Sequence, residues 1–164
     1  MGFWVFFKVG GGGKMRKNGF SLVELLIVVG VILIVAAIAI PNLMKSRAVA
    51  NESSAVASLH SLLTAETNFA SACPSIGFTA ALADLGSALT CSGGNGQIDP
   101  QLETGTKAGY SFAITVSGGT PATEFSITAN PVSTGAGTRH FFVDQSGAIH
   151  YNPSAPATSA DSVL

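Results

Sequence analysis

Two hydrophobic patterns follow one another along the first half of the chain. Residues 20–40 form a run of 21 residues in which Glu24 is the one charged side chain. At about 1.5 Å per residue such a run is about 31 Å long as a helix, which matches the hydrocarbon thickness of a bilayer. The run therefore predicts a transmembrane helix over residues 20–40.

The second pattern begins after Pro41 and is periodic. A proline inside a helix removes one backbone hydrogen bond and crowds a carbonyl four residues earlier, so we expect a kink at Pro41 rather than an end. From there to about residue 70 the sequence has no further proline or glycine. Apolar residues recur at helical spacing, which predicts an amphipathic continuation of the helix over residues 41–72. They are Val49, Val56, Leu59, Leu63 and Phe69.

The last third of the chain has the alternation of strands. In residues 110–117 apolar and small polar side chains alternate, as in a strand with one buried face. A partner strand is expected at 125–129, a third at 140–143 and a fourth at 148–151. The fold class that follows is α+β: a long N-terminal helix packed on a small antiparallel sheet of three to four strands.

Turn-forming residues punctuate the rest of the globular part, which we expect over residues 73–164. The stretch from Pro74 to residue 109 is rich in glycine, and Leu82, Leu85 and Leu89 predict one short helical turn within it. The tail at 153–164, rich in serine, alanine and proline, is expected to be loosely held.

The distribution of charge predicts the orientation of the apolar segment in a membrane. Four of the eight basic residues precede it and no acidic residue does. The positive-inside tendency then places the N-terminus in the cytoplasm and the region after Pro41 across the membrane. Beyond Gly19 there are four basic and nine acidic residues, a net charge of −5, and no cluster of cations that would indicate nucleic-acid binding.

A cleaved secretory signal peptide is the alternative for this segment, because residues 37–39 have the small-x-small form of a cleavage site. The apolar run exceeds the usual 7 to 15 residues of such a peptide, and Glu24 interrupts it. A carboxylate in a membrane span is costly and is normally retained for a function and given a partner. No partner for Glu24 lies nearby in the sequence.

These features together resemble the N-terminal signature of type IV prepilins and of the pseudopilins of type II secretion. The signature joins a basic leader, Gly19, Phe20, a glutamate at Glu24 and a proline, Pro41, at the end of the span. The resemblance is close over about residues 14–70, and beyond them it extends only to the pilin architecture of a helix, a loop and an antiparallel sheet.

The resemblance implies a processing pathway and an assembly. A prepilin peptidase cuts between Gly19 and Phe20, making residues 1–19 a leader, and the new amine of Phe20 is N-methylated. Glu24 then pairs with that amine on a neighbouring subunit as the helices enter a filament. The implied partners are copies of this chain, other pilins, the peptidase and methyltransferase, a membrane platform protein and an assembly ATPase.

The resemblance also implies a location: a single-pass precursor in the bacterial inner membrane, and a filament at the cell surface or in the periplasm. The leader departs from the usual short polar form, because residues 1–13 are mostly apolar and end in four glycines. Met15 would begin a more typical leader, so we expect that residues 1–14 precede the true start.

Cys73 and Cys91 are the two cysteines, and both are expected on the exported side. An oxidising compartment favours a disulfide between them, with two separate thiols as the alternative. No cofactor is indicated. His60, His140 and His150 lack acidic or cysteine residues spaced to complete a metal site, the acidic residues of a calcium loop are missing around Asp144, and no catalytic triad is apparent.

Three functions remain open on this reading. The first is a structural pilin that polymerises into a pilus and is not an enzyme. The second is a pseudopilin of a type II secretion system, and the third is a membrane-anchored binding domain that never polymerises. Glu24 argues against the third, because a plain anchor has no use for that charge.

Overall fold

The computed structural model describes residues 20–86 and 97–164. A long helix, α1 (Leu22–Ala72), is followed by two single-turn helices, α2 (Leu82–Leu85) and α3 (Pro100–Glu103), and then by a sheet. The chain divides into two compact units, one ending at Ala39 and the other comprising Ile40–Leu164. The first part of α1 belongs to the first unit and the rest of α1 to the second.

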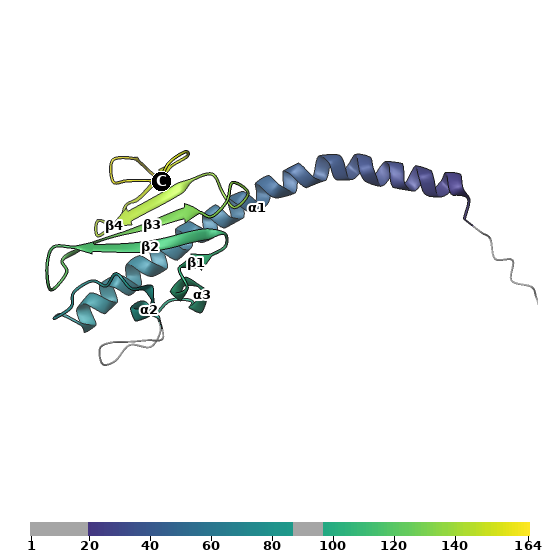
Figure 1. The fold of residues 1–164 in the computed structure, drawn as a ribbon. Coiled ribbons are helices and arrows are strands. Elements are labelled where there is room, and N and C mark those ends of the chain that lie inside the picture. The colour runs from purple at the N-terminus through teal and green to yellow at the C-terminus, as the bar shows by residue number, and fades with distance from the viewer. Residues whose placement is uncertain (1–19, 87–96) are drawn as a thin grey trace, which may run out of the picture. The chain divides into compact units, whose positions relative to one another are not determined.

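The sheet is an antiparallel meander of six strands (Figure 1). Each strand pairs with the next in sequence order, so that the order across the sheet is β1-β2-β3-β4-β5-β6. The strands are β1 (Thr106–Lys107), β2 (Tyr110–Ser117), β3 (Glu124–Pro131), β4 (His140–Asp144), β5 (Ile149–Asn152) and β6 (Ser162–Val163).

The expectation of three to four strands is therefore corrected to six. The four predicted strands are β2 to β5, and their antiparallel order is confirmed. The two additional strands lie at the two edges and have two residues each. A two-residue strand is too short to show an alternating pattern, so sequence periodicity could not reveal it.

The sheet has one buried face because its apolar residues are in register. On β2 and β3 the partners Phe112 and Ala129, and Ile114 and Ile127, lie opposite each other. These positions are buried while their neighbours along β2 are exposed. The period-2 pattern predicted from the sequence is thus the pattern of burial in the structure.

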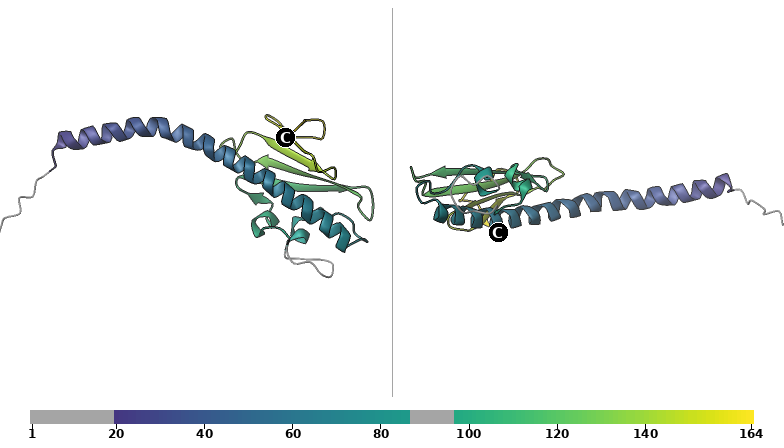
Figure 2. Two further views of the ribbon diagram at one scale, coloured as in Figure 1. Left: turned by 180° about the vertical axis from the view of Figure 1, so that it is seen from behind. Right: turned by 90° about the horizontal axis from the view of Figure 1, so that it is seen from below.

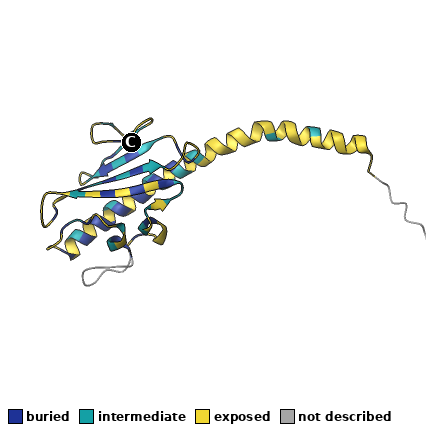
Figure 3. Ribbon diagram, in the orientation of Figure 1, coloured by how far each residue is buried: buried dark blue, intermediate teal, exposed yellow. Residues whose placement is uncertain are grey.

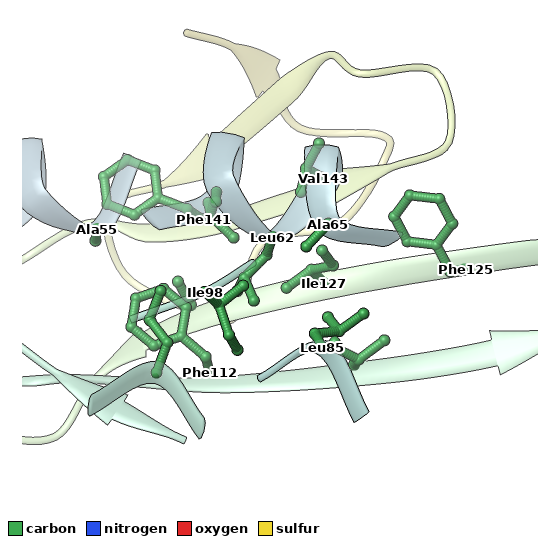
Figure 4. Close-up of a cluster of buried hydrophobic side chains, with 14 of the residues drawn as sticks. Ala55, Leu62, Ala65, Leu85, Ile98, Phe112, Phe125, Ile127, Phe141 and Val143 are labelled. Carbon is green, nitrogen blue, oxygen red and sulfur yellow. The ribbon is translucent and has the colours of Figure 1, made fainter. Parts of the chain in front are cut away.

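The second half of α1 covers this buried face and forms a two-layer domain with the sheet (Figures 1 and 2). The buried positions of the helix repeat every three or four residues, as expected for one helical face. They are Glu52, Ala55, Ser58, Leu59, Leu62, Ala65, Glu66 and Phe69. In Figure 4 the side chains of Leu62 and Ala65 lie among Ile127, Phe141 and Val143 of the sheet.

Helix α1 continues through Pro41 without interruption, as predicted. The bend expected at Pro41 lies next to the boundary between the two units and stays a prediction. The helix ends at Ala72, where Pro74 provides no backbone donor to extend it. Beyond this end Gly77 forms a parallel bridge with Ala122, at a positive φ of 78° and so close to the Ala122 carbonyl that a β-carbon would collide with it.

The described part of the segment between α1 and the sheet contains two short helices. The short helix predicted around Leu82 and Leu85 is confirmed as α2, while Leu89 lies outside the described residues. Helix α3 was not predicted. Asp99 caps it by accepting a hydrogen bond from the Gln101 amide at 2.8 Å, and Pro100 follows the cap, which is a favoured start of a helix.

The expectation of a loosely held tail was wrong. Ser162 and Val163 pair with β5, and Ala157 is buried. Asp161 accepts hydrogen bonds from the Thr158 amide at 2.7 Å and from the Asn152 side chain at 2.8 Å. Such local side-chain bonds order a segment whose composition by itself resembles a flexible linker.

Candidate assembly segment

The described part of the first unit is almost entirely helical and has almost no buried surface. Among residues 20–47 only Gly30 and Ala36 are even partly covered, and the rest are exposed (Figure 3). Of the described helices, α1 is the one long and apolar enough to cross a membrane, with a mean hydropathy of 3.1 over its most apolar 18 residues and none of them buried. An apolar surface of this extent is covered in the working protein, by lipid or by other protein.

The helix begins immediately after Ser21, whose carbonyl accepts the first bond from the Leu25 amide at 3.2 Å. Phe20 lies just before it and is 79% exposed. Glu24 is the third residue of the helix, where a negative charge is favoured by the helix dipole.

Ser21 and Glu24 also have the spacing of a capping box, a feature that the sequence analysis overlooked. The structure contains no side-chain hydrogen bond at this box within the described residues. Glu24 is exposed there and has no ionic partner in the described part of the chain. Its position in the first turn puts it close in sequence to Phe20, but its carboxylate is available to a group from another molecule.

The remaining predicted site residues are distributed along the chain. Pro41 lies inside α1, and Gly19 lies outside the described residues. Cys73 is buried at the end of α1, and no cysteine in the described ranges is free. Cys91 lies in the segment that the structure does not describe, so the pairing of Cys73 with Cys91 stays a prediction.

His140 and His150 each contact a different polar group. His140 lies 2.7 Å from the Asn130 side chain, and His150 lies 2.7 Å from the carbonyl of Asp161. Asp144 accepts a hydrogen bond from the Ser146 amide in the turn between β4 and β5, which explains its position without a bound ion. Within residues 20–86 and 97–164, no group of three potential ligands could hold a metal ion.

Glu52 fastens α1 to the loop that leads into β4, a contact that the sequence analysis did not predict. Its Oε2 lies 2.7 Å from Nε of Arg139, and its Oε1 accepts from the amide and the hydroxyl of Thr138 at 2.9 and 3.1 Å. Burial raises the pKa of Glu52, but the donors of Thr138 and Arg139 outweigh this and hold the pKa below its usual value. The sequence feature that could have indicated this contact is an acidic residue on the apolar face of the helix, three residues before Ala55.

The guanidinium of Arg139 is in turn placed by aromatic rings. It lies 5.6 Å from the ring centres of Phe141 and Tyr151. The hydroxyl of Tyr110 donates to the Arg139 carbonyl at 2.8 Å, and burial raises the pKa of Tyr110 to about 12. The contact between α1 and the sheet therefore has a polar clamp at the end where the helix first meets the sheet.

Glu66 lies on the same face of α1, four turns further on, and is fully buried. Its Oε2 accepts from the Thr79 amide at 3.2 Å, while its Oε1 has no hydrogen-bond partner. Burial, with a contribution from the charge of Asp84, raises the pKa of Glu66 to about 7 in spite of the bond from Thr79. Glu66 therefore holds a proton at mildly acidic pH.

Comparison with known proteins points to one class of protein for the N-terminal part. Residues 14–40 match the family model of the prokaryotic N-terminal methylation motif. This stretch contains Gly19, Phe20 and Glu24, and it ends one residue before Pro41. The resemblance derived from the sequence is confirmed for this segment, which carries the methylation motif of prepilins.

A particular relative agrees with this class. The chain is 50% identical over 54 residues to the type IV major pilin protein PilA of Myxococcus xanthus (strain DK1622). The alignment covers 33% of this chain and 24% of the relative, so it spans about a quarter of that pilin. No solved structure matches the chain. A third of this chain is thus similar to part of a pilin, and the α+β architecture agrees with the predicted fold class.

Replacement of Glu52 by glutamine should destabilise the second unit by about 2 kcal/mol, because Arg139 loses its buried counter-charge. Since the pKa of Glu52 is lowered on folding, its contribution is present above about pH 4.5 and is lost as the pH falls. Urea denaturation followed by tyrosine fluorescence measures the loss. The matched control is Glu124→Gln, which removes an exposed charge and should change stability by less than about 0.5 kcal/mol. Equal stability of the two variants at pH 7 would contradict the clamp.

The raised pKa of Glu66 makes stability depend on pH in the opposite direction from Glu52. Between about pH 4.5 and 7 the folded chain holds a proton that the unfolded chain releases, so the free energy of unfolding falls as the pH rises through this window. The fall should be about 2 to 3 kcal/mol between pH 5 and 8. In Glu66→Gln this component should vanish, as measured by urea denaturation at each pH. A pH slope that is unchanged in Glu66→Gln would show that another group is responsible.

Proposed function

We propose that this chain is a type IV pilin-like structural subunit, which polymerises into a helical filament through the first part of α1. The single observation that supports the proposal most strongly is the coincidence of two properties in one segment. Residues 22–39 lie within the methylation motif and form an exposed apolar helix with no cover inside the described chain. The apolar surface of such a helix has to be covered by something outside its own domain.

Glu24 favours the assembled filament over the lone subunit. In the membrane-held precursor the carboxylate has no counter-ion, and in a filament it lies within reach of the amine of Phe20 on a neighbour. Entry into the filament then replaces an unpaired charge at the edge of the hydrocarbon by an ion pair, which favours assembly in addition to helix packing. The exposed acid in the first helical turn supports this role, because it has no ionic partner among residues 20–86 and 97–164.

Processing has to come first. Cleavage between Gly19 and Phe20 by a prepilin peptidase creates the amine, and N-methylation of Phe20 follows. The other partners under this proposal are further pilins, a platform protein in the inner membrane and a cytoplasmic assembly ATPase. The precursor spans the inner membrane once with its N-terminus in the cytoplasm, and the second unit is exported with the filament.

A pseudopilin of type II secretion is the second function that the same segment supports, since the methylation motif is common to both. Two features of the second unit favour a pilus. Cys73 is buried at the end of α1 with no free thiol, and the turn at Asp144 is closed by its own hydrogen bonds. A structural role without catalysis agrees with the similarity to a pilin.

Removal of the Glu24 charge should abolish or strongly reduce filaments. We expect Glu24→Ala to yield less than about a tenth of the wild-type amount of sheared surface filaments, because the pair with Phe20 contributes more than about 1.4 kcal/mol per subunit. The matched control is Ser21→Ala, which alters the same helical turn without touching the charge. Both variants must be present in the membrane fraction at wild-type level. Normal filament yield from Glu24→Ala would exclude the proposed pair.

The mature chain should begin at Phe20. Intact-mass analysis of sheared filaments or of the membrane-held protein should give the mass of residues 20–164 plus one methyl group. Reduction should add the mass of two hydrogen atoms if Cys73 and Cys91 are bridged. A mass that still contains residues 1–19 would count against membership of the pilin class and against the assembly mechanism.

A further inference from the structure

Two basic residues on α1 have no role in the proposed assembly or in the packing of the fold. Lys45 and Arg47 are the first charged residues of α1 after Glu24, and both are exposed. They take part in neither of the two ion pairs found within the described residues. The next acidic residue along the helix is Glu52, and its oxygens are already occupied by Arg139 and Thr138.

Their position coincides with the end of the uncharged part of the helix. Glu24 and Lys45 bracket 20 residues without charge, residues 25–44. As a helix these residues extend for about 30 Å, which is the hydrocarbon thickness of a bilayer. A chain that spans a membrane with this stretch therefore holds Lys45 and Arg47 at the level of the headgroups, on the side of the second unit.

The arrangement around the helix also suits a headgroup layer. Lys45 and Arg47 are two residues apart, which is about 200° around the helix axis, so they point to nearly opposite sides. All residues from 37 to 47 are exposed, so neither side of the helix is covered by protein in the described chain. A single protein partner would contact one side of the helix, whereas lipid headgroups surround it.

The two cations are also not needed for orientation. The four basic residues ahead of the apolar run already give the positive-inside asymmetry, and cations on the opposite side weaken it. Their presence there calls for a specific use. Long basic side chains at a membrane interface place their charge among phosphates while their stems lie against apolar chains.

We propose that Lys45 and Arg47 form a binding ring for anionic phospholipid, which enriches phosphatidylglycerol-type headgroups around the helix at the face where the second unit emerges. The ring would hold the unassembled subunit at a fixed depth, with residues 25–44 in the hydrocarbon. This inference rests on the membrane span of the proposed function but not on polymerisation.

A local fluorescence experiment tests the ring. The full chain with Trp4→Phe and Leu43→Trp has one tryptophan, two residues from Lys45. It is placed in vesicles of equal parts phosphatidylglycerol and phosphatidylcholine, with bromine on the acyl chains of one lipid or of the other. The ratio of quenching gives the relative association constant of the two lipids at this side of the membrane, away from the basic residues of the N-terminus.

We expect phosphatidylglycerol to be preferred about fivefold in this background, and the ratio to fall to about one when Lys45→Gln and Arg47→Gln are added. Lys107→Gln is the control for loss of positive charge, since Lys107 is paired with Asp99 in the second unit, and it should leave the ratio unchanged. A ratio near one in the parent, or an unchanged ratio without the two cations, would overturn the proposal.

A second copy of the chain is the rival partner for the two cations. In that case the lipid ratio is near one. Self-association then falls in the double variant with Lys45→Gln and Arg47→Gln, and it falls equally in Glu124→Gln, which removes an exposed acid. That result would also overturn the lipid ring. A preference for phosphatidylglycerol in a chain that forms no filaments would support the ring while the assembly proposal fails. Quenching by neither lipid would refute the membrane span and the ring together.

Discussion

The second unit depends on the burial of one face of α1 against the sheet. Leu59, Leu62 and Phe69 are fully or almost fully buried there, and each such side chain contributes about 1.5 to 3 kcal/mol relative to exposure. The sheet has only one apolar face, and no other described helix is longer than four residues. Without α1 the apolar face of β2 to β5 would be open to water, so the helix and the sheet form as one cooperative unit.

This constraint explains why the same helix can serve two environments. Along residues 20–47 nearly every side chain is exposed, and along the second half of α1 the buried positions follow a single stripe. The helix continues from one part into the other, with one backbone donor missing at Pro41, so that no loop is needed between a segment suited to lipid and a segment suited to a core. The two parts differ in sequence pattern, almost uniformly apolar in the first and amphipathic in the second, and therefore in what can cover the side chains.

Acidic side chains on α1 are used in three different ways. Glu52 is paired with Arg139 and stabilises the domain, whereas Glu66 is buried with one unsatisfied oxygen and destabilises it when ionised. Glu24 has no partner within the described chain and is the residue to which we assign an intermolecular role. Burial and the supply of donors, rather than position on the helix alone, decide which of these consequences a carboxylate has.

The sequence by itself determined the elements that rest on a long periodic signal or on a motif. The long helix, its passage through Pro41, the strands β2 to β5 and the methylation motif around Gly19, Phe20 and Glu24 all follow from residue order, because helical and strand periodicities are local properties of the chain.

Only the tertiary structure decided the rest. The edge strands β1 and β6, the ordered tail around Asp161 and the contacts of Glu52 and Glu66 each join residues that are distant in sequence or too few to form a pattern. Glu52 and Arg139 are 87 residues apart, and nothing local to either residue indicates the other. Their contact exists because α1 and the loop before β4 are brought together by the packing of the core.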